Sequence, residues 1–219
     1  MMWLGLDTAT PACSIALWTP AGLISDTEWL ASPQHSEQLL RRIEAVRIRA
    51  QLPNWSQLSG IVVGVGPGSF MGVRLAVCVA QAMAFATKIP VFPVSSLQIV
   101  AETAAAKWNL KKAHIAWDAR MNQVYYGVYQ RDEGGIMQCI GEEQLCAPGS
   151  IAIPVSHSCV GNGWSVYREA WGMSETPPHA DIVPDISCLL SKLGPTVSVT
   201  EGIAPEQLAP VYLRAAVVH

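Results

Sequence analysis

The sequence is poor in charge and has no excess of positive residues. Of its 219 residues, 14% are Asp, Glu, Lys or Arg, and the formal net charge at pH 7 is -3. A chain with this balance has no strong positive field to draw it to nucleic acid or to an anionic membrane. Any RNA that it serves is therefore expected to be bound only through a partner.

Membrane-spanning and secretory signals are also missing. The longest apolar run without a charge, residues 75–87, is shorter than the roughly 20 residues that a membrane-spanning helix needs. The first ten residues, MMWLGLDTAT, contain no basic region and already include an acid, Asp7. The sequence predicts a cytoplasmic protein that does not associate with a membrane.

Metal-ligand spacing is absent as well. The six cysteines are scattered without a CxxC pair, and no histidine stands at metal-ligand spacing from any of them. Most are expected to be small buried side chains in a reducing compartment. We therefore expect no metal and no cofactor.

A repeated pattern of strands and helices is what the sequence does contain. MWLGLD, ACSIALW and LISDTEW read as three strands, followed by a helix near residues 35–50, the apolar strand GIVVGVG and a helix over 72–87. Near residue 110 the pattern restarts with AHIAWD, QVYYGVYQ and IMQCIGEEQ, and Asp118 takes the place of Asp7. Such a duplication is how two-lobed folds are built.

The repeat predicts an α/β, actin-like fold whose two lobes derive from a duplicated βββαβα unit. After residue 144 prolines are frequent and one helix is convincing, around 186–193, so the second lobe is expected to be reduced. The predicted division is a first lobe over 1–104, a second over 105–205, and a C-terminal segment over 206–219 that can return to the first lobe.

The glycine-rich turn GVGPGSFMG, residues 64–72, fits none of the familiar glycine motifs. A Walker A loop needs a lysine, and none occurs before residue 88. A nucleophile elbow centred on Ser69 would need glycines where Pro67 and Met71 stand, and the dinucleotide pattern fails too. We expect these glycines to serve backbone geometry in a tight strand-to-helix turn.

Actin-like kinases and ATPases hold phosphate with a D-x-G-x-[ST] turn after the first strand, and both copies of that turn are altered. The first reads DTAT, with Ala9 in place of glycine, and the second reads DARM, with Arg120. Asp7 and Asp118 remain a pair that could share a metal, although an Asp at a strand end more often caps its own turn. A stand-alone ATPase or phosphotransferase using this residual cleft is the alternative function.

Five blocks, DTATPACSIALW, GPGSFMGVRLAV, VSSL, DARMNQVYYGVY and PVYLR, occur in an order that resembles the TsaB (YeaZ) family. This resemblance implies an actin-like, RNase H-like fold and a role in making threonylcarbamoyladenosine next to the anticodon of tRNA. In that machinery the paralogue TsaD carries the iron, the nucleotide site and the transferase chemistry, and TsaE is an ATPase. Met71 departs from the family, which usually has Thr there. The group was once called glycoproteases, but no protease site is evident.

The resemblance implies a non-catalytic scaffold that forms a homodimer alone, binds TsaD, and meets TsaE and tRNA only through the complex. The helix over 72–87 is apolar nearly all round, so one side can pack on the sheet while another needs a cover. One side carries Val73, Ala76, Val77, Ala80 and Ala84, and another carries Leu75, Cys78, Val79, Ala82 and Ala86. The other possibility is that the helix over 35–50 covers it completely. We predict that the interface consists of His35, Leu39, Arg42, Ile43, Val46, Val73, Ala76, Val77, Ala80 and Ala84.

Overall fold

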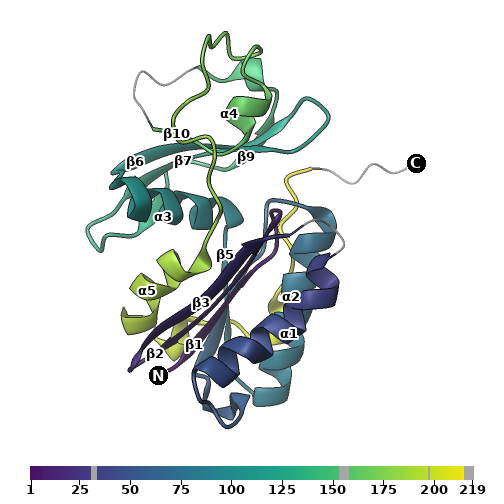
Figure 1. The fold of residues 1–219 in the computed structure, drawn as a ribbon, viewed down its shortest axis with the longest axis vertical. Coiled ribbons are helices and arrows are strands. Elements are labelled where there is room, and N and C mark those ends of the chain that lie inside the picture. The colour runs from purple at the N-terminus through teal and green to yellow at the C-terminus, as the bar shows by residue number, and fades with distance from the viewer. Residues whose placement is uncertain (31–33, 153–157, 197, 215–219) are drawn as a thin grey trace.

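The computed structural model describes residues 1–30, 34–152, 158–196 and 198–214, and shows two β-sheets in two lobes (Figure 1). The strand order is β3-β2-β1-β4-β5 in the first sheet. In the second it is β10-β6-β7-β8, with β9 also paired to β7. In both sheets the first strand of an antiparallel meander also pairs with a parallel strand, β1 with β4 and β6 with β10. This shared arrangement confirms the predicted duplication.

The first sheet is buried on both faces at its centre. Strands β1 (Trp3–Asp7), β2 (Ala12–Thr19) and β3 (Gly22–Trp29) form the meander. Strands β4 (Gly60–Gly64) and β5 (Val91–Val94) extend it in parallel. Every residue of β1 and β4 is buried, which explains why GIVVG is continuously apolar.

Three helices cover this sheet, one of them from the far end of the chain. Helices α1 (Gln34–Arg49) and α2 (Phe70–Thr87) lie on one face, and α5 (Ile186–Thr196) lies on the other (Figure 1). Ser69 caps α2 by accepting a hydrogen bond from the Gly72 N–H. The apolar faces of all three helices therefore form one sandwich around the sheet.

The second lobe is smaller. Its strands are β6 (Lys112–Asp118), β7 (Val124–Arg131), β8 (Met137–Cys139), β9 (Gln144–Cys146) and β10 (Cys159–Val160). Its helices are α3 (Ser96–Trp108) and the short α4 (Gly163–Val166). Along the whole described chain, short 3-10 helices lie at Trp55–Gln57, Pro148–Ser150, Val199–Glu201 and Pro205–Gln207. The predicted third strand, IMQCIGEEQ, contains β8 and ends at the first residue of β9, and both of these short strands pair with β7.

The packing departs from the predicted lobe boundaries in two places. Helix α3 begins inside the predicted first lobe, 1–104, yet it contributes its apolar side to the core of the second sheet. Helix α5, predicted within 105–205, packs on β1 and β2 of the first sheet. The chain therefore crosses between the lobes, and no single boundary separates them.

The C-terminal segment lies against the first lobe. Ile203 forms a bridge with Val91 of β5, and the N–H of Val211 donates to the carbonyl of Val65, 2.7 Å away. The last part of the predicted segment 206–219, residues 215–219, is outside the described residues. The segment thus runs along α2 on its way to the end of the described chain.

Candidate functional site

The glycine-rich turn packs directly on the first DTAT turn. The N–H of Ser69 donates to the Ala9 carbonyl at 2.6 Å, and the Thr8 hydroxyl donates to the Gly72 carbonyl at 2.7 Å. A Cβ on Gly68 would overlap the Ala9 carbonyl oxygen, and one on Gly72 would overlap the Thr8 carbonyl oxygen. These glycines allow two backbones to approach closely, which confirms the prediction of a geometric role.

This contact covers the turn where actin-like proteins hold phosphate. Thr8, Ala9 and Thr10 are all buried, at 0%, 1% and 3% exposure. The start of α2 and the glycine-rich turn occupy the space in front of them. In this structure the first turn is part of the protein core.

Asp7 is fully buried at the end of β1. Its Oδ1 accepts a hydrogen bond of 2.8 Å from the Ser96 hydroxyl, and Ser96 in turn accepts one from the Gly66 N–H. Its Oδ2 has no hydrogen-bond partner in the described part of the chain. Burial raises the pKa of Asp7 to about 6, although the hydrogen bonds from Ser96 and the Ala9 backbone oppose this shift.

Asp118 caps its own turn in the second lobe. Its Oδ1 accepts hydrogen bonds from the Tyr167 hydroxyl at 2.7 Å and from the Arg120 N–H at 2.8 Å. Its Oδ2 lies 3.4 Å from the Arg120 guanidinium. Arg120, Met121 and Asn122 all have left-handed φ angles, of 62°, 55° and 55°.

The two predicted cleft residues are not joined by any hydrogen bond among the described residues: Asp7 is bound by Ser96 at the start of α3, and Asp118 by Tyr167. Over the same residues, no group of three His, Cys, Asp or Glu side chains is arranged to hold a metal. The structure thus gives Asp7 and Asp118 separate local roles.

The eight apolar residues of the predicted interface lie on the inward sides of α1 and α2. Those that pack in the core against the first sheet are Leu39, Ile43, Val46, Val73, Ala76, Val77, Ala80 and Ala84. None of them is more than 3% exposed. Small and β-branched side chains let α2 approach the sheet closely, so the sheet already uses the side that we predicted for a partner.

The two polar residues of that prediction make contacts within the molecule. A ring nitrogen of His35 lies 2.9 Å from the Pro11 carbonyl oxygen. The Arg42 guanidinium forms ion pairs with Asp26 and Glu28 of β3, which also holds α1 on the sheet. Both side chains thus have contacts within the fold, and their contact with a partner stays a prediction.

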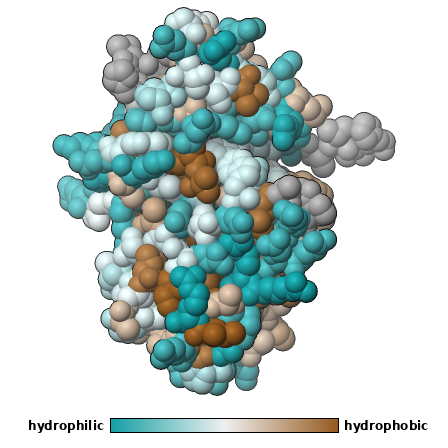
Figure 2. Space-filling model, in the orientation of Figure 1, coloured by the Kyte–Doolittle hydropathy of each residue, from teal (hydrophilic) through white to brown (hydrophobic). Residues whose placement is uncertain are grey.

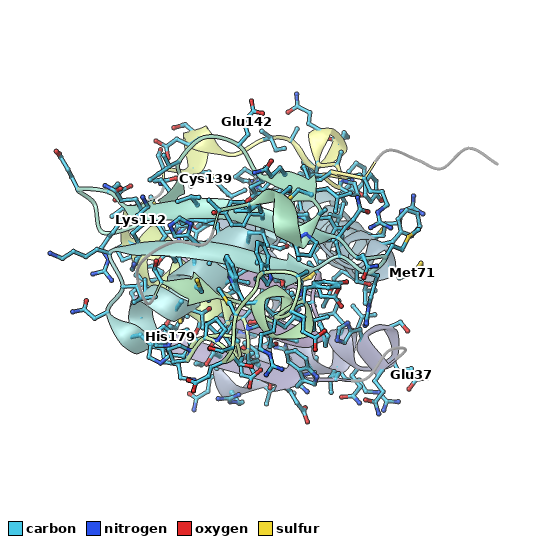
Figure 3. The ribbon with its side chains drawn as sticks, turned by 90° about the horizontal axis from the view of Figure 1, so that it is seen from above. Glu37, Met71, Lys112, Cys139, Glu142 and His179 are labelled. Atoms are coloured by element: carbon cyan, nitrogen blue, oxygen red, sulfur yellow. The ribbon has the colours of Figure 1, made fainter. Side chains whose placement is uncertain are left out.

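The opposite side of α2, which we call the outer α2 face, is apolar and exposed. Its exposed members are Met71, Cys78, Ala82 and Phe85, and Leu75 beside them is partly buried against the core. Met71 is 70% exposed and Phe85 is 69% exposed, and Met71 points away from the molecule at its edge in Figure 3. Figure 2 shows further hydrophobic patches among polar ones over the first lobe. Sequence reasoning placed Leu75, Cys78 and Ala82 together but did not name them among the interface residues.

Helix α2 is also long and apolar enough to cross a membrane, by length and composition alone. Core helices of soluble proteins pass the same test, so this is weak evidence for a membrane span. The inward side of α2 packs on the first sheet. The exposed apolar side chains are therefore confined to one side of a helix that is already docked.

Two lobes that repeat one strand pattern, with helices on both faces of the first sheet, define a protein of the actin-like, RNase H-like class. The family model for TsaD, tRNA N6-adenosine threonylcarbamoyltransferase, matches residues 29–205. The tRNA threonylcarbamoyladenosine biosynthesis protein TsaB of Escherichia coli K12 is 31% identical over 98% of this chain and 95% of its own length. The Haemophilus influenzae TsaB is 31% identical over 96% and 92%. The chain belongs to the TsaB family.

A solved structure agrees with this assignment. The structure of YeaZ from Pseudomonas aeruginosa aligns with a TM-score of 0.85 and 36% sequence identity, covering 97% of this chain and 99% of that one. A second structure, of a protein described as similar to peptidase YEAZ from the same organism, gives a TM-score of 0.86. The whole described fold is thus shared with these proteins.

Proposed function

We propose that this protein is a non-catalytic scaffold and activator subunit for the threonylcarbamoyladenosine modification of tRNA. It binds a TsaD-type paralogue, which transfers the threonylcarbamoyl group, and it meets TsaE and tRNA through that complex in the cytoplasm. The observation that carries the proposal is the outer α2 face, an apolar surface on a helix that is already packed on its own sheet. Exposed patches of this kind mark interaction sites.

The buried first turn supports a non-catalytic role. Thr8, Ala9 and Thr10 are covered by the start of α2, and Asp7 is buried beneath them. The alternative, an ATPase or phosphotransferase using Asp7 and Asp118, would need both carboxylates to reach a ligand. A serine protease is disfavoured because the Ser69 hydroxyl accepts a hydrogen bond from Gly72 as a helix cap.

The kinship with TsaD supports the choice of partner. Because the TsaD family model matches most of this chain, a TsaD-type protein has a related fold and a helix equivalent to α2. A self-complementary patch nearly fits a relative of itself at a two-fold interface. The homodimer and the TsaD complex should therefore compete for the outer α2 face.

Ala82→Arg tests this proposal, because it places a cation in the middle of the outer α2 face while its side chain can still reach water in the monomer. Pairing would bury an unpaired charge, which costs about 3 to 5 kcal/mol. We expect the variant to lose the homodimer in sedimentation and TsaD in a pull-down. Ala106→Arg, at an exposed alanine of α3, is the matched control. A folded Ala82→Arg protein that keeps both complexes would show that the face is wrong.

Titration with ATP and magnesium separates the proposal from its alternative. We expect weak binding at best and no hydrolysis by the isolated protein, because the first turn is covered. Low-micromolar binding in calorimetry that disappears in Asp118→Asn would instead support the phosphotransferase.

A further inference from the structure

The two lobes are joined on two opposite sides of the molecule. Figure 1 shows α3 and α5 on the left, and the end of the described chain, in yellow, passing between the lobes on the right. The two sides differ in how deeply their contacts are buried and in the charges that they pair. This difference indicates which side stays together and which can open.

Helices α3 and α5 join the lobes through buried contacts, which we call the hinge. Lys192 of α5 forms an ion pair of 2.5 Å with Glu102 of α3, whose side chain is fully buried. The other oxygen of Glu102 accepts a hydrogen bond of 2.6 Å from the Met137 N–H. Ile99 of α3 and Ile186 of α5 belong to one hydrophobic cluster. Separating these helices would leave a buried charge without its partner, which is strongly unfavourable.

Hydrogen bonds at the start of α5 reinforce the hinge. The Asp185 Oδ1 accepts one of 3.0 Å from the Thr27 hydroxyl of β3, and the Asp185 N–H donates one of 2.9 Å to the Thr103 hydroxyl of α3. Beside them a cavity of about 280 Å³ lies between Trp29 of the first lobe and Asn162 of the second. The lobes are therefore tied together at α3 and α5, with open space next to the tie.

On the other side the lobes are joined by residues 211–214, which we call the strap. The strap begins on the first lobe, where the Val211 N–H donates to the Val65 carbonyl at 2.7 Å. The next side chain is held there as well, because the Tyr212 hydroxyl accepts a hydrogen bond of 2.7 Å from Arg74 Nε. Backbone and side chain both fix this half of the strap to the first lobe.

Arg214 extends the strap to the second lobe, and we call its contacts the latch. The guanidinium donates to the Ala119 carbonyl and to the Gln123 side-chain oxygen, each at 2.9 Å, and it contacts Met121 Sδ. These three acceptors are neutral and belong to the turn that follows Asp118. Hydrogen bonds that pair two opposite charges are stronger, so the latch is weaker than the ion pair in the hinge.

A further contact joins the lobes near the latch. The Tyr125 hydroxyl of β7 lies 3.5 Å from the carbonyl oxygen of Gly68 in the glycine-rich turn, which is long for a hydrogen bond. The latch side therefore depends on a neutral set of acceptors and one long contact. Groups of this kind can exchange their partners for water at a small net cost.

We propose that the two lobes rotate about the hinge and that Arg214 is the latch that keeps them closed. In the open state the Arg214 guanidinium is hydrated, and the Asp118 turn moves away from the glycine-rich turn together with the second lobe. The strap stays on the first lobe. Closure of two lobes about a hinge is a common two-state motion. The motion belongs to the isolated chain and needs no partner.

Double electron–electron resonance between spin labels on the two lobes tests the latch. Ala45 of α1 and Val166 of α4 are exposed, and labels introduced there as noncanonical amino acids leave the six cysteines unmodified. We expect a main, closed distance in the labelled parent. In Arg214→Ala the share of a second, longer distance should rise roughly tenfold, as expected for the loss of hydrogen bonds from a charged donor.

Arg168→Ala is the matched control, because it removes an exposed arginine from the same lobe and should leave the distances as in the parent. Both labels lie outside the Asp118 turn, so a local loosening of that turn would not lengthen the distance. An Arg214→Ala protein with the parent's distribution would overturn the latch.

Lys192→Met tests the hinge. It leaves Glu102 without its cation, so we expect a lower midpoint in urea unfolding, while the folded protein keeps the main distance of the parent. If Lys192→Met does not fold, Thr27→Val takes its place, because it removes a hydrogen-bond donor to Asp185. A hinge variant that lengthens the distance as much as Arg214→Ala does would show that α3 and α5 are not the pivot.

Discussion

The two Asp turns stand at the same place in the duplicated unit, yet one is buried and the other is open. Thr8, Ala9 and Thr10 lie beneath the start of α2, whereas the Arg120 side chain is 86% exposed and Met121 is 76% exposed. The first turn ends in the core, and the second ends in solvent.

The difference comes from where the glycines of each lobe make their close approach. In the first lobe Gly68 and Gly72 approach the turn itself. In the second lobe Gly161 and Gly163 approach the Ala116 carbonyl within β6, where added Cβ atoms would lie 2.5 and 2.8 Å from its oxygen. The same strand pattern therefore carries one Asp turn that is covered by its neighbours and one that is open to solvent.

Gly72→Ala should break the buried turn and has the largest expected effect. Alanine favours a helix over glycine by about 1 kcal/mol, but the added Cβ would overlap the Thr8 carbonyl oxygen. Moving that backbone should cost about 3 kcal/mol or more, so the clash outweighs the helix propensity. Thermal or urea unfolding measures the loss. Gly134→Ala, which meets only the Asp132 side chain, is the control, and a Gly72→Ala protein as stable as this control would refute the explanation.

The free energy of unfolding of Asp7→Asn should depend on pH differently from that of the parent protein, which sharpens the comparison between the two Asp turns. Burial raises the pKa of Asp7 to about 6 from 3.8, so the native state binds its proton more tightly than the unfolded state does. The stability that this group contributes is present below pH 4 and is lost as the pH rises through 6. A neutral Asn does not titrate. The free energy of unfolding of Asp7→Asn relative to the parent should therefore rise by about 2 to 3 kcal/mol between pH 4 and 7.

Urea unfolding of both proteins at several pH values measures that difference. Asp118→Asn serves as the comparison, because Asp118 accepts hydrogen bonds from Tyr167 and from the Arg120 N–H. Parallel stability curves for Asp7→Asn and its parent would contradict the raised pKa.

Met121→Gly should change the open turn only slightly, and in the stabilising direction. Met121 has a φ of 55°, which costs a non-glycine residue about 1 to 2 kcal/mol and glycine almost nothing. The entropy of an added glycine offsets part of that gain, so we expect a net gain of about 0.5 kcal/mol. Ala106→Gly, in helix α3, should lose about 1 kcal/mol instead. A clear loss of stability in Met121→Gly would mean that the turn depends on this side chain.

The order of the elements was predictable because each has a local signal. The strands of the first lobe, helices α2 and α5, and the restart at residue 112 all follow from periodicity, turns and caps. The side of α2 that packs on the sheet was not predicted. A helix that is apolar all round has little periodicity to indicate its inward side, and the positions of Arg74 and Gln81 were the available signal. Both lie away from the core side that carries Val73 and Ala80.

The exchange of helices between the lobes was beyond sequence reasoning. No local sequence signal in residues 186–196 indicates that this helix will cover the strands formed by residues 3–19, because only tertiary packing selects that partner. The same holds for Tyr212, which joins Phe70 and Arg74 at the start of α2. The contacts of Tyr212 with Phe70 and Arg74 thus became visible only in the folded chain.

The position of α5 late in the sequence delays the covering of the first sheet during synthesis. The sheet face that carries Trp3, Ala16 and Val62 is closed by Ile186 and Leu190, which leave the ribosome long after the strands they cover. Between Val62 and Ile186 lie about 120 residues, which take roughly 6 to 25 seconds to make at about 5 to 20 residues per second. Throughout that interval the nascent lobe presents one uncovered apolar side of its sheet to whatever proteins surround the ribosome.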